Sequence, residues 1–179
     1  MKHRILVAGI GNIFLGDDGF GVEVAARLAD AGLPDWVRVA DYGISGLHLA
    51  YDLAEGYQTA ILVDAAPRGG EPGSVYVLKV EPGAAQGART PPPLVLDGHG
   101  MQPDVVLGML DMLGAGAGTR VLVVGCEPAS TEEGIGLSAP VAAAVGRAVN
   151  IVLDLARDAA APEARDNQQR GIHVPRHTG

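Results

Sequence analysis

The sequence predicts an α/β protein, a three-layer sandwich with helices on both faces of a twisted, mostly parallel five-stranded sheet. Short runs of Val, Leu and Ile alternate with segments of helical periodicity, which is the order of strand–helix–strand units. One connection, residues 67–73, is too short for a crossover helix, so we expect the strand after it to be antiparallel. The 179 residues are enough for one domain with a single core.

The first predicted strand is the continuous apolar run of residues 5–10, and a glycine-rich turn follows it. A helix with one apolar and one charged face begins near Gly19 and ends before Gly32 and Pro34. The residues expected to face the core are Val22, Ala25, Ala26 and Leu28, opposite Glu23, Arg27 and Asp30.

We predict the second strand at residues 36–41 and the third at residues 59–64, with a helix capped by Ser45 between them. The third strand ends on a carboxylate, that of Asp64. The antiparallel strand is expected at residues 74–80. The expected core residues of the second helix are Leu47, Leu49, Ala50 and Leu53.

Residues 81–100 form a long segment rich in Gly, Ala and Pro, and loops of this length are usually functional or mobile. A third helix is predicted after this loop, with Pro103 in its first turn. Its apolar positions are Val105, Val106, Met109, Leu110 and Leu113.

The last strand is predicted at residues 120–126, and a polar loop leads from it to a final helix capped by Ser138. The apolar positions of this helix are Val141, Ala144, Val145, Ala148, Ile151, Val152 and Leu155. Residues 1–158 form the predicted domain. Residues 159–179 lack periodicity, and we expect them to be a disordered tail.

Composition excludes several classes of partner. The net charge is −8 and no stripe of Lys or Arg offsets it, so we expect no nucleic-acid partner. The single cysteine, Cys126, cannot form an internal disulfide and fits a reducing compartment. We find no signal peptide and no run near the roughly 20 apolar residues of a membrane span. The expectation is a cytoplasmic protein that is not bound to a membrane and is a monomer.

Several carboxylates and one histidine lie at or after the ends of predicted strands, or before a predicted helix. Asp17 and Asp18 lie in the turn after the first strand, Asp64 ends the third, and His99 lies between two glycines before the third helix. Each has a plain structural explanation: a helix cap for one of the pair, a turn-forming role for Asp64, and a solvated loop position for His99. A second carboxylate beside the cap, however, has no structural need to be there.

Asp18, Asp64 and His99 together would make a metal site. Ligands of open α/β sheets bind outside the carboxyl ends of the strands, where right-handed crossovers bring these three segments. Imidazole and carboxylate donors suit nickel, zinc, copper or iron, and three protein ligands leave coordination positions open. The sparse donor set indicates modest affinity, as expected if the metal arrives with the substrate.

Two other interpretations are weaker. Gly9-x-Gly11 resembles the start of a dinucleotide-binding loop, but Phe14 occupies the third glycine position and two carboxylates would face the pyrophosphate. Cys126 as a nucleophile would need an activating base, and at the end of an apolar strand it is more often a small buried hydrophobic residue.

Five short motifs follow one another between residues 3 and 157. They are Gly9-x-Gly11-Asn12 with Asp17-Asp18-Gly19-x-Gly21, then Asp41-x-Gly43-x-x-Gly46, Val63-Asp64-Ala65, His99 and Gly125-x-x-Pro128. In this order they resemble the hydrogenase maturation endopeptidases, the small proteases that finish the large subunit of nickel–iron hydrogenases. The surroundings of the histidine, Asp97-Gly98-His99-Gly100-Met101, depart from the serine- or proline-flanked form of better-known members.

The resemblance implies a specific reaction. The family removes a C-terminal extension from the nickel-loaded large-subunit precursor, and its nickel-sensing ligands map onto Asp18, Asp64 and His99. It therefore implies a metal-dependent aspartate/histidine-type endopeptidase whose nickel is supplied by the substrate protein. The glycine turn at residues 43–46 and the loop at residues 81–100 would hold the substrate's tail.

Two alternatives stay open beside this one. A non-catalytic chaperone or metal-binding module would recognise the nickel-loaded subunit without cutting it. A nucleotide-binding protein would be stabilised by NAD or ATP.

Overall fold

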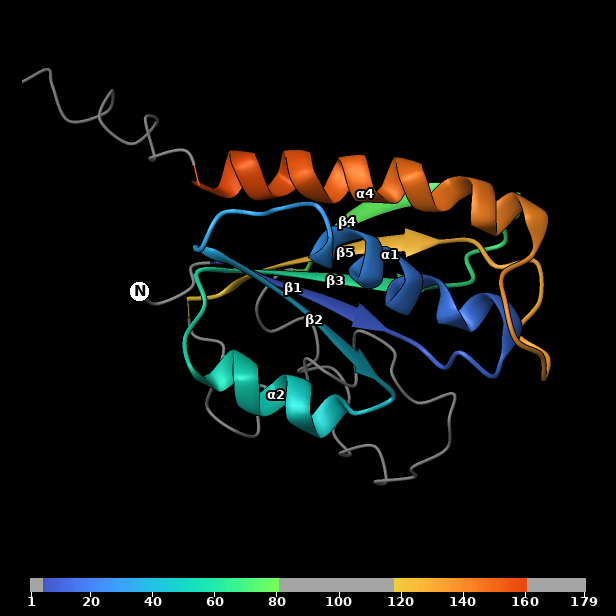
Figure 1. Ribbon diagram of the computed structural model, residues 1–179, viewed down its shortest axis with the longest axis horizontal. Coiled ribbons are helices and arrows are strands. Elements are labelled where there is room, and N and C mark those ends of the chain that lie inside the picture. The colour runs from blue at the N-terminus through green and yellow to red at the C-terminus, as the bar shows by residue number, and fades with distance from the viewer. Residues whose placement is uncertain (1–4, 81–117, 161–179) are drawn as a thin grey trace, which may run out of the picture.

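The computed structural model describes residues 5–80 and 118–160 of the chain, and in them it contains the predicted α/β fold (Figure 1). Five strands form one sheet in the order β2-β1-β3-β5-β4. All neighbours pair in parallel except β4, which is antiparallel as predicted; its partner is β5, which the sequence did not specify. The strands are β1 (Ile5–Ile10), β2 (Val37–Gly43), β3 (Thr59–Ala65), β4 (Val75–Val80) and β5 (Arg120–Cys126).

The described helices cover both faces of this sheet (Figure 1). On one face lie α1 (Phe20–Ala29) and α4 (Ala139–Ala160), which also contact each other, and on the other face lies α2 (Gly46–Ala54). A short 3-10 turn, η1 (Gly16–Gly19), precedes α1. The three-layer prediction is therefore confirmed. The predicted third helix and the loop before it lie outside the described residues.

The core is divided by the sheet into two apolar clusters. In β3, Ile61 and Val63 pack on the side of α1 and α4, whereas Ala60 and Leu62 pack on the side of α2. Because side chains alternate along a strand, the next residue, Asp64, faces the α2 side.

The apolar faces of the first two helices differ from the prediction. In α1 Val24 is buried, while Val22 is only half-buried and Ala26 is exposed. In α2 Leu47 is 54% exposed, although the other three expected positions are buried. Both helices bury a stripe that includes a glycine of the first turn. The stripes are Gly21, Val24, Ala25 and Leu28 in α1, and Gly46, Leu49, Ala50 and Leu53 in α2.

The final helix is longer than predicted. It continues through Ala160, so the predicted domain boundary at residue 158 falls inside it, and residues 161–179 lie outside the described residues. The 22-residue helix α4 contains an 18-residue window with a mean hydropathy of 1.5, so it is long and apolar enough to cross a membrane, contrary to the expectation that no segment comes close. In the structure its stripe from Val141 to Ala156 packs in the core beside α1, and 33% of that window is buried.

Close packing of α1 fixes the turn that precedes it. A Cβ atom on Gly21 would lie 2.1 Å from the carbonyl oxygen of Val63 and 2.3 Å from that of Ile10. Only a glycine allows so close an approach of helix and sheet. The turn at residues 11–19 is thereby held at the carboxyl edge of β1 and β3.

Candidate active site

The fold brings two of the three predicted ligands together. Asp18 comes from the turn after β1, and Asp64 from the carboxyl end of the neighbouring parallel strand β3. Their carboxylates interact, because the charge of Asp18 contributes to a raised pKa at Asp64. The convergence expected from the strand order is therefore present in the structure for this pair.

Asp17 faces away from the pair and has a structural role. Its side chain is buried, and its carboxylate accepts hydrogen bonds from the backbone amides of Ala129, Ser130 and Ser138 at 2.6–3.1 Å. The Ser138 hydroxyl also donates to it, at 2.8 Å. Burial opposes ionisation, but these hydrogen bonds outweigh it and hold the pKa of Asp17 below its usual value. Asp17 thus ties the turn to the loop before α4.

Both predicted cap residues directly precede their helices, and Ser45 is the N-cap residue of α2, but neither serine hydroxyl makes a capping hydrogen bond. The hydroxyl of Ser138 donates to Asp17 instead. A serine hydroxyl can bond in several directions, so its place before a helix does not by itself make it a cap.

Asp18 is held on the other side of the same turn. Its Oδ2 accepts a hydrogen bond of 2.7 Å from the backbone amide of Asn12. The residue is half-buried, and this hydrogen bond ties its carboxylate to the turn. The two adjacent carboxylates therefore have different hydrogen-bond partners.

Asp64 is the most perturbed acid of this site. The residue is 6% exposed, and burial raises the pKa of its carboxyl well above the usual value. The charge of Asp18 raises the pKa further, and the backbone amide of Ala65 offsets part of the effect. Burial and the neighbouring negative charge therefore both disfavour the ionised form of Asp64.

His99, the third predicted ligand, lies outside the described residues, so its place relative to the pair stays a prediction. Within residues 5–80 and 118–160 no group of three His, Cys, Asp or Glu side chains could hold a metal ion. The described part of the chain therefore supplies two carboxylates to the predicted site.

Sequence reasoning missed the two side chains, Glu127 and Tyr76, that bind the backbone just after Asp64. Glu127, which follows β5, accepts hydrogen bonds from the amides of Arg68 and Gly69 at 2.7 and 3.1 Å, and these lower its pKa. Tyr76 of β4 donates its hydroxyl hydrogen to the carbonyl of Ala66. The signal for Glu127 was available, because an acid directly after an apolar strand is the same pattern that singled out Asp64.

The two weaker chemical interpretations find no support in the geometry. The amide of Gly11 donates to the carbonyl of Gly43 at 3.0 Å, and that of Asn12 to Asp18, so neither is available to a pyrophosphate. Cys126 is fully buried, and burial raises the pKa of its thiol to about 11. A thiol in this environment stays protonated and is a core residue.

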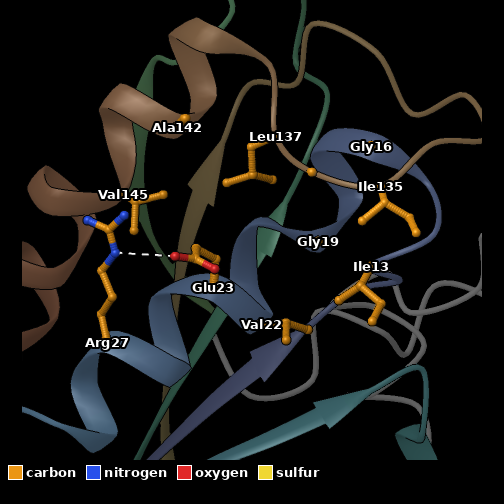
Figure 2. Close-up of a pocket in the computed structure, with 11 residues that line it drawn as sticks. Ile13, Gly16, Gly19, Val22, Glu23, Arg27, Ile135, Leu137, Ala142 and Val145 are labelled. Carbon is orange, nitrogen blue, oxygen red and sulfur yellow. Dashed lines mark hydrogen bonds and ion pairs between the residues drawn. The ribbon is translucent and has the colours of Figure 1, made fainter.

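A separate groove lies between α1, α4 and the loop before α4 (Figure 2). It has a volume of about 320 Å³, and Ile13, Val22, Leu137 and Val145 give it apolar walls. Glu23 and Arg27 pair with each other along its side at 3.3 Å (Figure 2). Neither Asp18 nor Asp64 lines this groove, so it is distinct from the carboxylate pair.

The described residues thus define an α/β protein in which two carboxylates, those of Asp18 and Asp64, interact at the carboxyl edge of the parallel strands. The family model described as hydrogenase maturation protease matches residues 22–155. The chain belongs to the hydrogenase maturation protease family and is therefore a protease.

Individual relatives agree with this assignment. The hydrogenase 2 maturation protease of Escherichia coli is 32% identical over 161 residues, which are 87% of this chain and 92% of the relative. The solved structure of the hydrogenase maturating endopeptidase HybD from E. coli is similar with a TM-score of 0.68 and 31% identity, over 88% of this chain and 94% of that one. The solved structure of a hydrogenase 2 maturation peptidase from a Thaumarchaeota archaeon is similar with a TM-score of 0.66 and 32% identity. The match covers 86% of this chain and 98% of that one.

Proposed function

We propose that this protease removes the C-terminal extension of a nickel–iron hydrogenase large-subunit precursor after nickel has been inserted, and that the precursor's nickel is the recognition element. The observation that supports the proposal is the Asp18–Asp64 pair. Mutual repulsion and burial disfavour two negative charges there, and a divalent cation presented by the substrate would relieve both effects. In this proposal the nickel belongs to the substrate.

In the proposed complex Asp18 and Asp64 donate carboxylate oxygens to the precursor's nickel, and His99 donates an imidazole nitrogen. This mixture of oxygen and nitrogen ligands suits nickel. Because the protease offers only three ligands, the metal is expected to stay with the substrate. Docking in this way places the scissile peptide bond beside the site and makes its hydrolysis effectively intramolecular.

The reaction is the addition of water across one peptide bond. A water activated by a carboxylate or by the metal attacks the carbonyl carbon, its hydroxyl stays on the new C-terminus, and a proton passes to the leaving nitrogen. We assign the endopeptidase an aspartate/histidine type on this basis and a cytoplasmic location, where the precursor is folded and loaded.

The experiment compares nickel-loaded and nickel-free precursor, each incubated with the protease and weighed by intact-protein mass spectrometry. We expect loss of the C-terminal mass from the loaded form alone. Cleavage of both forms at equal rates would contradict recognition through nickel. Binding of the loaded form without any mass loss would instead identify a chaperone.

A variant tests the role of His99. His99→Ala should abolish cleavage of the loaded precursor, because the metal loses a ligand, while the circular dichroism spectrum stays that of the wild type. His48→Ala, which changes a histidine of α2, is the matched control and should cleave normally. Unimpaired cleavage by His99→Ala would remove this residue from the site.

A further inference from the structure

Tyr76 lies in one row of the sheet with the candidate catalytic aspartate. In the register of the strands Asp64 of β3 is opposite Gly125 of β5, and Gly125 is opposite Tyr76 of β4. Directly paired residues point to the same face of a sheet, so the side chains of Asp64 and Tyr76 share the α2 side, with a glycine between them.

The missing side chain of Gly125 lets the phenol ring lie across β5. A Cβ atom on Gly125 would lie 2.4 Å from Cε2 of Tyr76, 2.8 Å from Cζ and 3.1 Å from the hydroxyl oxygen. The ring therefore occupies the space above Gly125 and extends toward β3. The guanidinium of Arg68 lies over the ring, 5.4 Å from its centroid.

The hydroxyl of Tyr76 then reaches the end of β3. It donates to the carbonyl oxygen of Ala66, and the amide of Ala66 donates to the carbonyl of Cys126 at 2.9 Å. Ala66 is thus held at both of its backbone groups, two residues after Asp64. The next turn is held as well, since the amides of Arg68 and Gly69 donate to Glu127.

We propose that Tyr76 is a positioning residue for Asp64: its hydroxyl fixes the backbone after Asp64, and its ring, lying over Gly125, forms the β4-side wall of the carboxylate site. The substrate's peptide and metal would meet Asp64 in one fixed orientation because the strand end cannot shift. This role rests on the proposed function of the Asp18–Asp64 pair and adds to it a residue from the edge strand.

Tyr76→Phe tests the proposal because it removes one oxygen and keeps the ring. We expect kcat for the nickel-loaded precursor to fall about tenfold with KM within twofold of the wild-type value, since the phenylalanine ring has no hydroxyl to hold Ala66. Tyr57→Phe is the matched control. It removes a hydroxyl that accepts from Arg38 near the opposite end of β3, and kcat should stay within twofold.

Amide hydrogen exchange gives a readout that needs no substrate. In Tyr76→Phe the amides of Ala66, Arg68 and Gly69 should exchange at least fivefold faster, while those of β1 keep their wild-type rates. If the substitution only lowered the overall stability of the fold, amide exchange would be faster throughout the sheet. Gly125→Ala should have the same local effect, because the added Cβ displaces the ring; if this variant does not fold, Tyr76→Phe carries the test.

Three results would overturn the proposal: wild-type kcat in Tyr76→Phe, a change confined to KM, or unchanged exchange at residues 66–69. If the wild-type protein itself fails to cleave the loaded precursor, the proposed function is wrong. The exchange measurement still decides whether Tyr76 holds the end of β3.

Discussion

Asp17 and Asp18 are neighbours in the sequence, yet their carboxylates have different partners and different surroundings. Asp17 is buried and bonded to the loop before α4, whereas Asp18 is half-buried beside Asp64. The sequence predicted a structural role for only one of the pair, as a helix cap, but the N-cap residue of α1 is Gly19. The sequence could not say which structural role Asp17 has, because its partners lie 112 to 121 residues away.

Replacing Asp17 should destabilise the fold. In Asp17→Asn one acceptor oxygen becomes an NH2 group that faces hydrogen-bond donors, and we expect a loss on the order of 2–3 kcal/mol in the free energy of unfolding. Urea denaturation at pH 7 measures the loss. Glu133→Gln, in the exposed part of the same loop, is the control and should change stability little. Wild-type stability in Asp17→Asn would contradict the tethering role.

The same carboxylate should make stability depend on pH. Because the folded pKa of Asp17 lies below its unfolded value, its contribution is complete above the unfolded pKa of about 3.9 and is lost as the pH falls through the folded pKa. Wild-type stability should therefore fall between about pH 5 and pH 2 more steeply than that of Asp17→Asn. Parallel pH profiles of Tm would argue against this assignment.

Asp64 makes stability depend on pH in the opposite direction. Its folded pKa is raised, so in metal-free buffer its ionisation lowers stability as the pH rises from the unfolded value of about 3.9 through the folded one. Asp64→Asn should therefore be more stable than the wild type at pH 7 in a chelator and unfold at a higher Tm. A lower Tm in the variant would show that the carboxylate stabilises the fold without metal.

Glycines in the first turns of α1 and α2 lie on the faces that pack against the sheet. They also make the apolar faces of these helices hard to predict. The buried stripes of α1 and α2 each include a glycine of the first turn, and glycine does not register as an apolar contact residue when periodicity is counted. Periodicity therefore favours Val22 and Leu47 as core residues, although neither is buried. The strands are easier to predict, because β1 and β5 are continuous apolar runs with the expected bounds.

The glycine contact of α1 can be tested with a matched pair of variants. Gly21→Ala should destabilise the protein by on the order of 3 kcal/mol, because its Cβ would collide with two strand carbonyls. Gly146→Ala, in α4 with open space around it, should stabilise by about 0.5–1 kcal/mol. Equal effects of the two substitutions on thermal unfolding would contradict the close packing of α1.

Across the whole molecule, the order of strands and helices was enough to predict a mostly parallel five-stranded sheet with one antiparallel strand, but not that this strand lies at the edge. Crossover handedness then placed the turn after β1 and the end of β3 at one edge, which is where the structure has Asp18 and Asp64. Long-range hydrogen bonds could not be predicted in this way. The position of Glu127 after an apolar strand marks it as unusual, but nothing in the local sequence identifies the distant backbone amides that Asp17 and Glu127 bind.

In the proposed protease Asp18 acts on the substrate while Asp17 holds the fold, and cleavage by the two asparagine variants separates these roles. Nickel-loaded precursor is incubated with equal amounts of folded Asp17→Asn or Asp18→Asn protein, and its C-terminal mass is followed over time. We predict that Asp18→Asn leaves the precursor uncut at a near wild-type Tm, whereas folded Asp17→Asn still cuts it. Normal cleavage by Asp18→Asn would show that this carboxylate has no part in the reaction.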